Sequence, residues 1–354
     1  MEYWQIVGEY GDGCHAGPKA QRDVTTILQG LGFRPFCVNR CRYGGLFGRM
    51  LNRLVWLVQC QMLRKRLPED CVLFMQYPSA AWSVSPSFRV VTPEGKKRKH
   101  FKLVSLFHDV PSLRWGEGAL ESRPLHAEES DLMALSDVII VHNPSMMDVL
   151  VKHGIPADKL ISLGAFDYLT PCKPKKDANL SCSVVIAGCL APDKVGYLDG
   201  VSQIKGVSWN LYGVQFDPSR LKGDDIKFLG CFPPEELPGK LAGSFGLVWD
   251  GPSIDTCTGD LGNYLRINNP HKLSLYLTSG MPVVIWDQAA EANFVRKHGV
   301  GICVASLREL SERLKVLRQE DYELMRHKAV ELSVKMRNGE FLKTAVLRAL
   351  EMLK

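Results

Sequence analysis

Short apolar segments alternate with longer segments of helical periodicity through the first half of the chain. The apolar segments have the length and the β-branched and aromatic content of strands, and helical patterns lie between them, one at about residues 18–30 and a long one ending near residue 63. This alternation is typical of βα units around a parallel sheet. The strands predicted in this first series are WQIVGEY, FRPFCVN, CVLFMQY, KLVSLFHD and DVIIVH.

A second series of the same kind follows residues 170–181, TPCKPKKDANLS. That segment has two prolines, three lysines and no apolar run, so we predict a linker. The sequence therefore predicts an α/β protein of two Rossmann-like domains, with a ligand cleft where the carboxyl ends of the two sets of strands face each other. Helical patterns close the chain from about residue 309 to 354, after the predicted strands SVVIAGCL, SWNLYGV, IKFLGCF, FGLVWDG, MPVVIWD and GICV.

Composition narrows the function classes. The 354 residues carry a net charge of only +6, and the basic residues are spread out apart from KKRKH at 96–100, so we predict no nucleic-acid partner. MEYWQIVGEY has no signal-peptide pattern and LVWLVQCQML is too short for a membrane span, which favours a cytoplasmic protein. The eleven cysteines include no C-x-x-C pair, so we expect reduced thiols, no metal site and no cofactor.

YGDGCHAGPKA at residues 10–20 places a G-x-G-x-x-A pattern between a predicted strand and a predicted helix. A dinucleotide site would also need an acidic residue about twenty positions further on. The chain instead has Asn39, Arg40 and Arg42 there, which would suit only a 2'-phosphate. Two other interpretations are a close approach of backbone to some other ligand and a purely structural turn.

Ends of predicted strands carry chemically useful side chains. His108 and Asp109 end KLVSLFHD, where Asp109 could take a proton from a hydroxyl and Arg114 could bind an anion. The alternative is that Asp109 caps the next turn and His108 hydrogen-bonds inside it. In the second half, strand ends and the turns after them converge on one rim, with these residues: Gly188, Lys194, Tyr212, Gly213 and Asp250.

NNPHKL at residues 268–273 precedes an apolar helical pattern. Asn269 can cap that helix, Pro270 suits its first turn, and Lys272 adds a full charge to the unpaired N–H groups of the helix start. A fold can hold a diphosphate in this way. The alternative is that Asn269 only caps the helix and Lys272 only points into solvent.

RMLNRLVWLVQCQMLRKRLP at residues 49–68 is apolar on one side and basic elsewhere. Such a helix could lie on an anionic membrane surface, and a helix that packs on the sheet has the same pattern. We favour packing on the sheet.

Several longer segments resemble one family. The chain is similar to the bacterial galactofuranosyltransferases of O-antigen and polysaccharide assembly, and more distantly to the glucosyltransferases that extend sugars on serine-rich-repeat adhesins. Residues 84–100 depart from the family, whose members are more apolar and helical there. The segments that carry the resemblance are AGPKAQRD, HDVPSLR, VHNPSMMDVL, GAFDYL, FGLVWDGPSIDTCTGDLGNYLRINNPHKLSLYL and IWDQAAEANFV.

The resemblance implies a GT-B fold and an inverting, metal-independent transfer of a hexosyl group, galactofuranose, from a UDP-sugar to a sugar hydroxyl of a growing surface polysaccharide. It implies an acceptor domain over residues 1–170, a nucleotide-sugar domain over 182–330, and a C-terminal helix over 331–354 that returns to the first domain. The expected partners are the UDP-sugar and a saccharide acceptor that can be lipid-linked, met at the inner face of the cell membrane by peripheral contact. A homo-oligomer is compatible with the sequence.

Site residues follow from the strand-end pattern and the resemblance together. We place the catalytic base on Asp109, with Asp12 and His15 as alternatives. The transferred sugar would face the glycine loop, and the nucleotide would meet the C-terminal half. The predicted donor-binding residues are Gly13, Gly17, Gly188, Lys194, Tyr212, Gly213, Asp250, Asn268, Asn269, His271 and Lys272.

Three alternative functions stay open on the sequence. One is a UDP-glucose-dependent glucosyltransferase of protein glycosylation. The second, an NADP-dependent oxidoreductase, would use GDGCHA with Arg40 and Arg42 and would have no use for NNPHK. The third is an inactive sugar-nucleotide sensor, which would bind a UDP-sugar and never release UDP.

Overall fold

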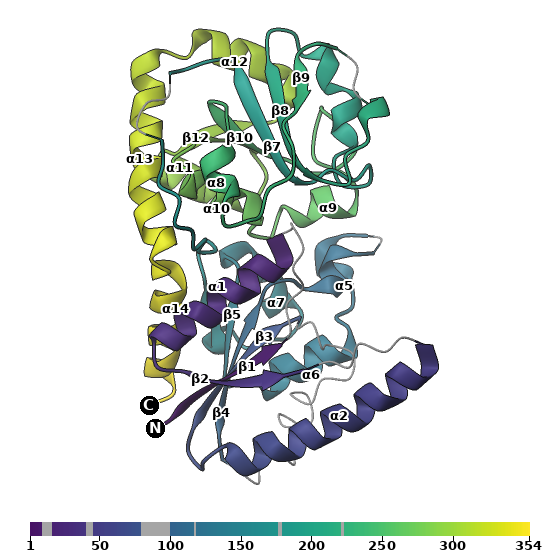
Figure 1. The fold of residues 1–354 in the computed structure, drawn as a ribbon, viewed down its shortest axis with the longest axis vertical. Helices are drawn as coiled ribbons and strands as arrows, with labels where there is room; N and C mark the ends of the chain where they lie inside the picture. The colour runs from purple at the N-terminus through teal and green to yellow at the C-terminus, as the bar shows by residue number, and fades with distance from the viewer. Residues whose placement is uncertain (9–15, 40–44, 79–99, 117, 176–178, 221–222) are drawn as a thin grey trace.

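The computed structural model describes residues 1–8, 16–39, 45–78, 100–116, 118–175, 179–220 and 223–354. Figure 1 shows two α/β units stacked along the long axis of the molecule, with the last helices running along one side of both. Both termini lie at the end of the first unit. The predicted α/β architecture with two successive sheets is confirmed.

The first sheet has six parallel strands in the order β2-β1-β3-β4-β5-β6. Apolar residues on both faces are buried, because helices cover both sides as in other doubly wound sheets. Its strand order reverses between β1 and β3. The strands are β1 (Tyr3–Gly8), β2 (Arg34–Val38), β3 (Val72–Tyr77), β4 (Lys102–Phe107), β5 (Val138–Val141) and β6 (Leu160–Ser162).

The second sheet repeats the plan, with six parallel strands in the order β12-β11-β10-β7-β8-β9. Its order reverses between β7 and β10, which is where open α/β sheets bind ligands beyond their carboxyl ends. The strands are β7 (Ser183–Cys189), β8 (Ser208–Val214), β9 (Ile226–Phe228), β10 (Phe245–Val248), β11 (Val283–Trp286) and β12 (Gly301–Val304).

The eleven strands expected from apolar runs are present, some shorter than expected, and β6 is an addition. Leu160–Ser162 has three residues, too few to show a strand pattern in the sequence. The α-helices are α1 (Ala16–Gly30), α2 (Gly45–Arg66), α5 (Pro111–Arg114), α6 (Ala127–Leu135), α7 (Pro144–Lys152), α8 (Leu237–Lys240), α9 (Gly259–Tyr264), α10 (His271–Thr278), α11 (Glu291–His298), α12 (Leu310–Val316), α13 (Gln319–Arg337) and α14 (Glu340–Met352).

The C-terminal crossing helix is two helices. α13 packs against α10 of the second unit, and α14 packs against α1, β5 and β6 of the first, along the left side of Figure 1. Leu342 and Val346 of α14 are buried in the core of the first sheet, and the Asp167 carboxylate accepts hydrogen bonds from the backbone N–H groups of Phe341 and Leu342. The predicted boundary between residues 330 and 331 lies inside α13.

Candidate functional site

A cavity of about 750 Å³ lies between the carboxyl ends of the two sheets. The end of β7, the start of α10 and the segment after β10 line one side, and the segment after β4 lines the other. Nine residues predicted from the sequence line this cleft: Gly17, Asp109, Gly188, Lys194, Asp250, Asn268, Asn269, His271 and Lys272.

Two predicted donor residues do not line the cleft. The Tyr212 hydroxyl donates to the carbonyl of Lys240 and accepts from the N–H of Ala242. At Gly213 a Cβ would lie 1.7 Å from the carbonyl oxygen of Gly188, so glycine is needed there for β7 and β8 to approach each other. Three further candidates, Asp12, Gly13 and His15, lie outside the described residues.

Charged side chains dominate the wall formed by the second unit. The Lys272 ammonium is buried and contacts the Asp250 carboxylate at 2.7 Å and the Trp249 carbonyl at 3.2 Å. Lys194 lies in the same wall. Among the cationic side chains that line the cleft in the described ranges, that of Lys194 alone has neither an ion pair nor a hydrogen bond, so it is the group most ready to meet an anion.

The electrostatic surroundings of Lys194 are mixed. The charge of Asp250 favours the ammonium form, but burial and the positive charges of Lys272 and Arg114 outweigh it and lower the pKa of Lys194. The Lys194 side chain is partly buried, and a bound anion would offset the effects of burial and of the neighbouring positive charges by favouring the ammonium form. The wall is therefore suited to phosphate oxygens.

The opposite wall holds neutral rings around Phe166. The Phe166 ring stacks on His108 and on His271, with centroids 5.6 and 5.0 Å away, and meets the His142 ring edge-on at 5.1 Å. His271 comes from the start of α10, so this cluster joins the two units. The Phe166 ring thus forms an apolar contact surface, and three imidazoles lie around it.

Burial keeps these imidazoles uncharged. Burial, together with His271 and His142, lowers the pKa of His108 to about 3, and burial lowers the pKa of His142 to about 4. Burial, together with Lys19 and His142, lowers the pKa of His271 to about 3. At neutral pH the cluster can therefore exchange hydrogen bonds with hydroxyl groups, and it resists becoming positively charged.

The hydrogen-bond partners fix two of the ring tautomers. The Asn269 N–H donates to His142 Nδ1 at 2.9 Å, so His142 carries its proton on Nε2. The Gln76 amide donates to Thr25, which leaves its oxygen to accept from His108 Nε2 at 2.7 Å. These two rings thus offer one donor, His142 Nε2, and one acceptor, His108 Nδ1.

Asp109 stands at the end of β4 beside this cluster. Its Oδ2 is paired with the Arg114 guanidinium, and its buried Oδ1 has no hydrogen-bond partner among the described residues. The Tyr264 hydroxyl, from the second unit, accepts a hydrogen bond from the N–H of Val110 and so fixes the chain next to Asp109. One carboxylate oxygen therefore stays available in the cleft.

Asn269 does not cap α10, and that prediction is wrong. The cap position is Pro270. The Asn269 amide donates to the carbonyls of His142 and Gly164, and its oxygen accepts from the Asn143 amide at 2.7 Å. Its side chain therefore joins the two units, because all three of these partners belong to the first unit.

Seven buried side-chain atoms of residues that line the cleft have no hydrogen-bond partner within the described part of the chain. Buried polar groups in folded proteins are nearly always paired, so this concentration indicates a surface whose partners come with a ligand. The atoms belong to both walls and are His108 Nδ1, Asp109 Oδ1, Arg114 Nε, His142 Nε2, Asn268 Oδ1 and both ring nitrogens of His271.

Sequence comparison agrees with this geometry. Residues 184–349 match the model described as "Glucosyltransferase 3-like, C-terminal domain", and residues 5–165 match the corresponding N-terminal domain. Over 318 residues the chain is 31% identical to beta-1,6-galactofuranosyltransferase WbbI of Escherichia coli K12, covering 87% of this chain and 88% of that protein. The chain belongs to the glucosyltransferase 3-like family of glycosyltransferases.

Solved structures show that this glycosyltransferase has the GT-B fold. Sucrose-phosphate synthase from Thermosynechococcus elongatus aligns over 100% of both chains with a TM-score of 0.66 and 13% identity. The Anabaena protein HepE in complex with UDP aligns over 99% of this chain and 100% of that one, with a TM-score of 0.59 and 12% identity. At this identity the likeness concerns the fold alone.

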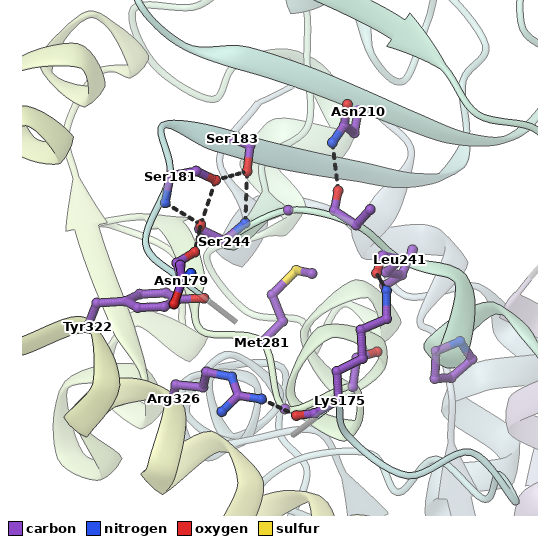
Figure 2. Close-up of a pocket in the computed structure, with 15 residues that line it drawn as sticks. Lys175, Asn179, Ser181, Ser183, Asn210, Leu241, Ser244, Met281, Tyr322 and Arg326 are labelled. Carbon is purple, nitrogen blue, oxygen red and sulfur yellow. Dashed lines mark hydrogen bonds between the residues drawn. The ribbon is translucent and has the colours of Figure 1, made fainter. Parts of the chain in front are cut away.

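A second hollow, of about 310 Å³, lies at the opposite, amino edge of the second sheet. Figure 2 shows Ser181, Ser183 and Ser244 bonded to one another, Lys175 turned to the Leu241 carbonyl, and Arg326 turned to the backbone of Lys175. No described residue that lines it has a buried side-chain atom without a partner. Its polar groups therefore hold the linker and α13 against the sheet.

Among the residues of the glycosyltransferase cleft that were not selected from the sequence, His142, Phe166 and Tyr264 make the contacts described above. His142 directly follows β5, so its place at a strand end was a usable signal. Phe166 and Tyr264 gave no comparable signal, because an aromatic residue in an irregular segment or at a helix end is usually part of the core. Both lie in segments that carry the family resemblance, GAFDYL and the block from Phe245.

Within the described ranges, no three His, Cys, Asp or Glu side chains lie close enough together to hold a metal ion. In the same part of the chain, no helix combines the length and apolar content needed to cross a membrane.

Proposed function

We propose that this glycosyltransferase moves galactofuranose from a UDP-sugar to a sugar hydroxyl of a growing surface polysaccharide, with inversion and without a metal ion. The similarity to WbbI supports the sugar, and the complex of HepE with UDP supports the nucleotide. The observation that carries the proposal is a cationic wall that faces an unpaired carboxylate oxygen across one cleft.

In this proposal residues 182–330 bind the nucleotide-sugar, residues 1–170 present the acceptor, and residues 331–354 return to the first domain. The diphosphate meets Lys194 and the first turn of α10, where Lys272 and the helix N–H groups add positive charge. The Gly188 backbone lines the cleft with no other group within 4 Å of its Cβ position, so a nucleotide can approach closely there.

The reaction is a direct displacement at the anomeric carbon. The acceptor oxygen forms the new bond to that carbon as its proton passes to Asp109 Oδ1, and the bond from the carbon to the diphosphate oxygen breaks. The leaving UDP carries the electron pair, and Lys194, Lys272 and the start of α10 stabilise its charge.

Asp109 suits the role of base better than the histidines beside it. When a carboxylate accepts a proton it becomes neutral, whereas an imidazole becomes a cation. The surroundings of His108, His142 and His271 disfavour that cation, as their lowered pKa values indicate. We therefore give these rings the task of binding hydroxyl groups of the sugars.

A glucosyl donor is the second candidate, because the family models carry the description glucosyltransferase 3-like. A donor panel of UDP-galactofuranose, UDP-galactopyranose, UDP-glucose and UDP-N-acetylglucosamine, scored by UDP release with a mixture of saccharide acceptors, separates the two. We expect the highest kcat/KM with UDP-galactofuranose. Preference for UDP-glucose would favour the second candidate, a glucosyltransferase. No UDP release with any pair of donor and acceptor would favour the inactive sugar-nucleotide sensor.

We further propose that the enzyme works in the cytoplasm at the inner face of the cell membrane on a lipid-linked acceptor. Supply of the acceptor in a vesicle rather than in free solution should then raise turnover. Equal rates with a lipid-linked and a lipid-free acceptor of the same sugar sequence would contradict this part.

A further inference from the structure

Helix α2 (Gly45–Arg66) packs on the first sheet with one side and exposes large apolar side chains on the other. One side is buried against the first sheet, including Trp56, Cys60 and Leu63. The other side is exposed, and five large apolar residues there have 60 to 78% of their surface exposed: Leu46, Phe47, Met50, Leu54 and Val58. Leu57 and Met62 extend this side at 37 and 42%.

These exposed positions share one side of the helix. At 100° per residue, the seven apolar positions from Leu46 to Met62 fall within an arc of roughly 160°, opposite Trp56 and Leu63. They extend along about 24 Å of helix. Figure 1 shows α2 at the far end of the first unit from the second, with its first turns projecting from the sheet. We call these seven residues the outer face of α2.

The charge of α2 is entirely of one sign. The helix contains no aspartate or glutamate and five basic residues: Arg49, Arg53, Arg64, Lys65 and Arg66. Lys65 is exposed and lies in the same arc as the outer face, and exposed Arg66 lies about 40° beyond the edge of this arc. An apolar face accompanied only by positive charge is the pattern of a helix that lies in the headgroup region of an anionic membrane.

We propose that the outer face of α2 is a docking surface for an anionic lipid bilayer, with the apolar residues entering the boundary of the acyl chains and Lys65 and Arg66 contacting lipid phosphates. This placement holds whichever sugar the enzyme transfers. It would fix the first unit, the proposed acceptor domain, on the membrane and leave the second unit free to exchange nucleotides.

A second copy of the chain suits this surface less well. Two α2 helices packed on their outer faces would bring the exposed Lys65 of each copy into the interface, and neither helix has an acidic residue to pair with it. Like charges held that closely oppose association, whereas anionic lipid neutralises all of them.

The test measures binding of the full chain to vesicles by sedimentation, with phosphatidylglycerol and phosphatidylcholine mixed or with phosphatidylcholine alone. We expect binding only to the mixed vesicles, weaker at high salt. The variant Met50→Ser, Leu54→Ser, Val58→Ser should bind about a hundredfold more weakly. Lys65→Gln with Arg66→Gln should lose about tenfold.

A matched control carries three serine replacements of similarly exposed apolar residues elsewhere, Leu324, Val334 and Leu347 on α13 and α14. It should bind vesicles like the wild type, and all variants should keep the wild-type UDP affinity and melting temperature. Equal loss in the control, or no binding of the wild type at low ionic strength, would overturn the proposal.

Two further measurements keep the proposal falsifiable. If the α2 variant does not fold, an environment-sensitive dye on Leu54→Cys should shift to the blue with anionic vesicles, and an unchanged spectrum would contradict docking. Sedimentation equilibrium without lipid tests whether a second copy of the chain occupies the outer face of α2. A dimer that the α2 variant disperses, without lipid binding by the wild type, would assign the surface to a second copy.

Discussion

The two walls of the cleft are built by the same architecture and carry opposite chemistry. Each wall stands at the carboxyl ends of a six-stranded parallel sheet. The second unit contributes Lys194 and a buried Lys272–Asp250 ion pair, while the first contributes neutral His108 and His142 with Asp109. The fold thus decides where the site is, and the side chains at the strand ends decide which half binds charge and which half handles hydroxyl groups.

The largest effect is expected on the first wall. Asp109→Asn keeps the shape and removes the base, so turnover should fall by roughly 10² to 10⁴ while UDP affinity changes little. Steady-state rates and calorimetry of UDP binding measure the two quantities separately. His271→Asn serves as the comparison, since this imidazole also has unpaired nitrogens, and it should reduce turnover much less. The opposite ranking would move the base to His271.

On the second wall, Lys194→Ala should lower the affinity for UDP, the quantity that Asp109→Asn leaves nearly unchanged. Loss of a charge-assisted contact costs about 1.5 to 3 kcal/mol, which corresponds to roughly 10- to 150-fold in Kd. Lys272→Ala should also weaken UDP binding, and it additionally leaves Asp250 unpaired. Lys227→Ala on exposed β9 is the matched control. UDP affinity equal to the wild type in a folded Lys194→Ala protein would disprove the anion-binding role.

The uncharged histidines of the cleft should affect how the free energy of unfolding changes with pH. The folded pKa of His271, about 3, is below the ordinary value of 6.5, so only the unfolded chain takes up its proton between these values. The contribution of His271 to the free energy of unfolding is therefore fully present above pH 6.5. It declines as the pH falls toward about 3, by roughly 1 kcal/mol per pH unit. His271→Gln should remove that contribution from the slope.

The difference between wild type and His271→Gln is the informative quantity, measured by urea unfolding from pH 7 to pH 5. Burial raises the pKa of Asp167 to about 7, and a raised carboxyl pKa makes stability increase as the pH falls through the same range. The wild-type curve alone sums these two effects with those of His108 and His142. Parallel curves for the two proteins would show that His271 titrates normally in the folded state.

The smallest effect is expected from chelation. If Lys194, Lys272 and the start of α10 stabilise the leaving diphosphate, turnover in excess EDTA should equal turnover without it. Activity that disappears in EDTA and returns with magnesium or manganese would show that the cationic wall is insufficient by itself.

The sequence predicted the sheets well because their strands are buried on both faces. Segments such as VVIAG and VVIW are continuous apolar runs between helical patterns, and both became strands. Leu160–Ser162 was missed because three residues carry no periodicity. Asn269 was assigned to a cap because only its neighbours in sequence were visible, and its real partners, His142 and Gly164, lie more than a hundred positions away.

The candidate site was predictable where it depends on strand ends and not where it depends on packing. Asp109 and Asp250 follow parallel strands and Gly188 lies at the end of one, and the fold brings such residues to one edge. The same reasoning also selected Tyr212, whose hydroxyl is bonded to the backbone at residues 240 and 242, because a strand end does not say which way a side chain points. The ring cluster around Phe166 needed the structure.

A crystal structure of the chain with UDP tests the division of the cleft most directly. We expect the diphosphate within hydrogen-bond distance of Lys194 and the first N–H groups of α10, with the Asp109 carboxylate facing it across space large enough for the transferred sugar. A diphosphate bound to the first unit, away from Lys194 and α10, would contradict the account.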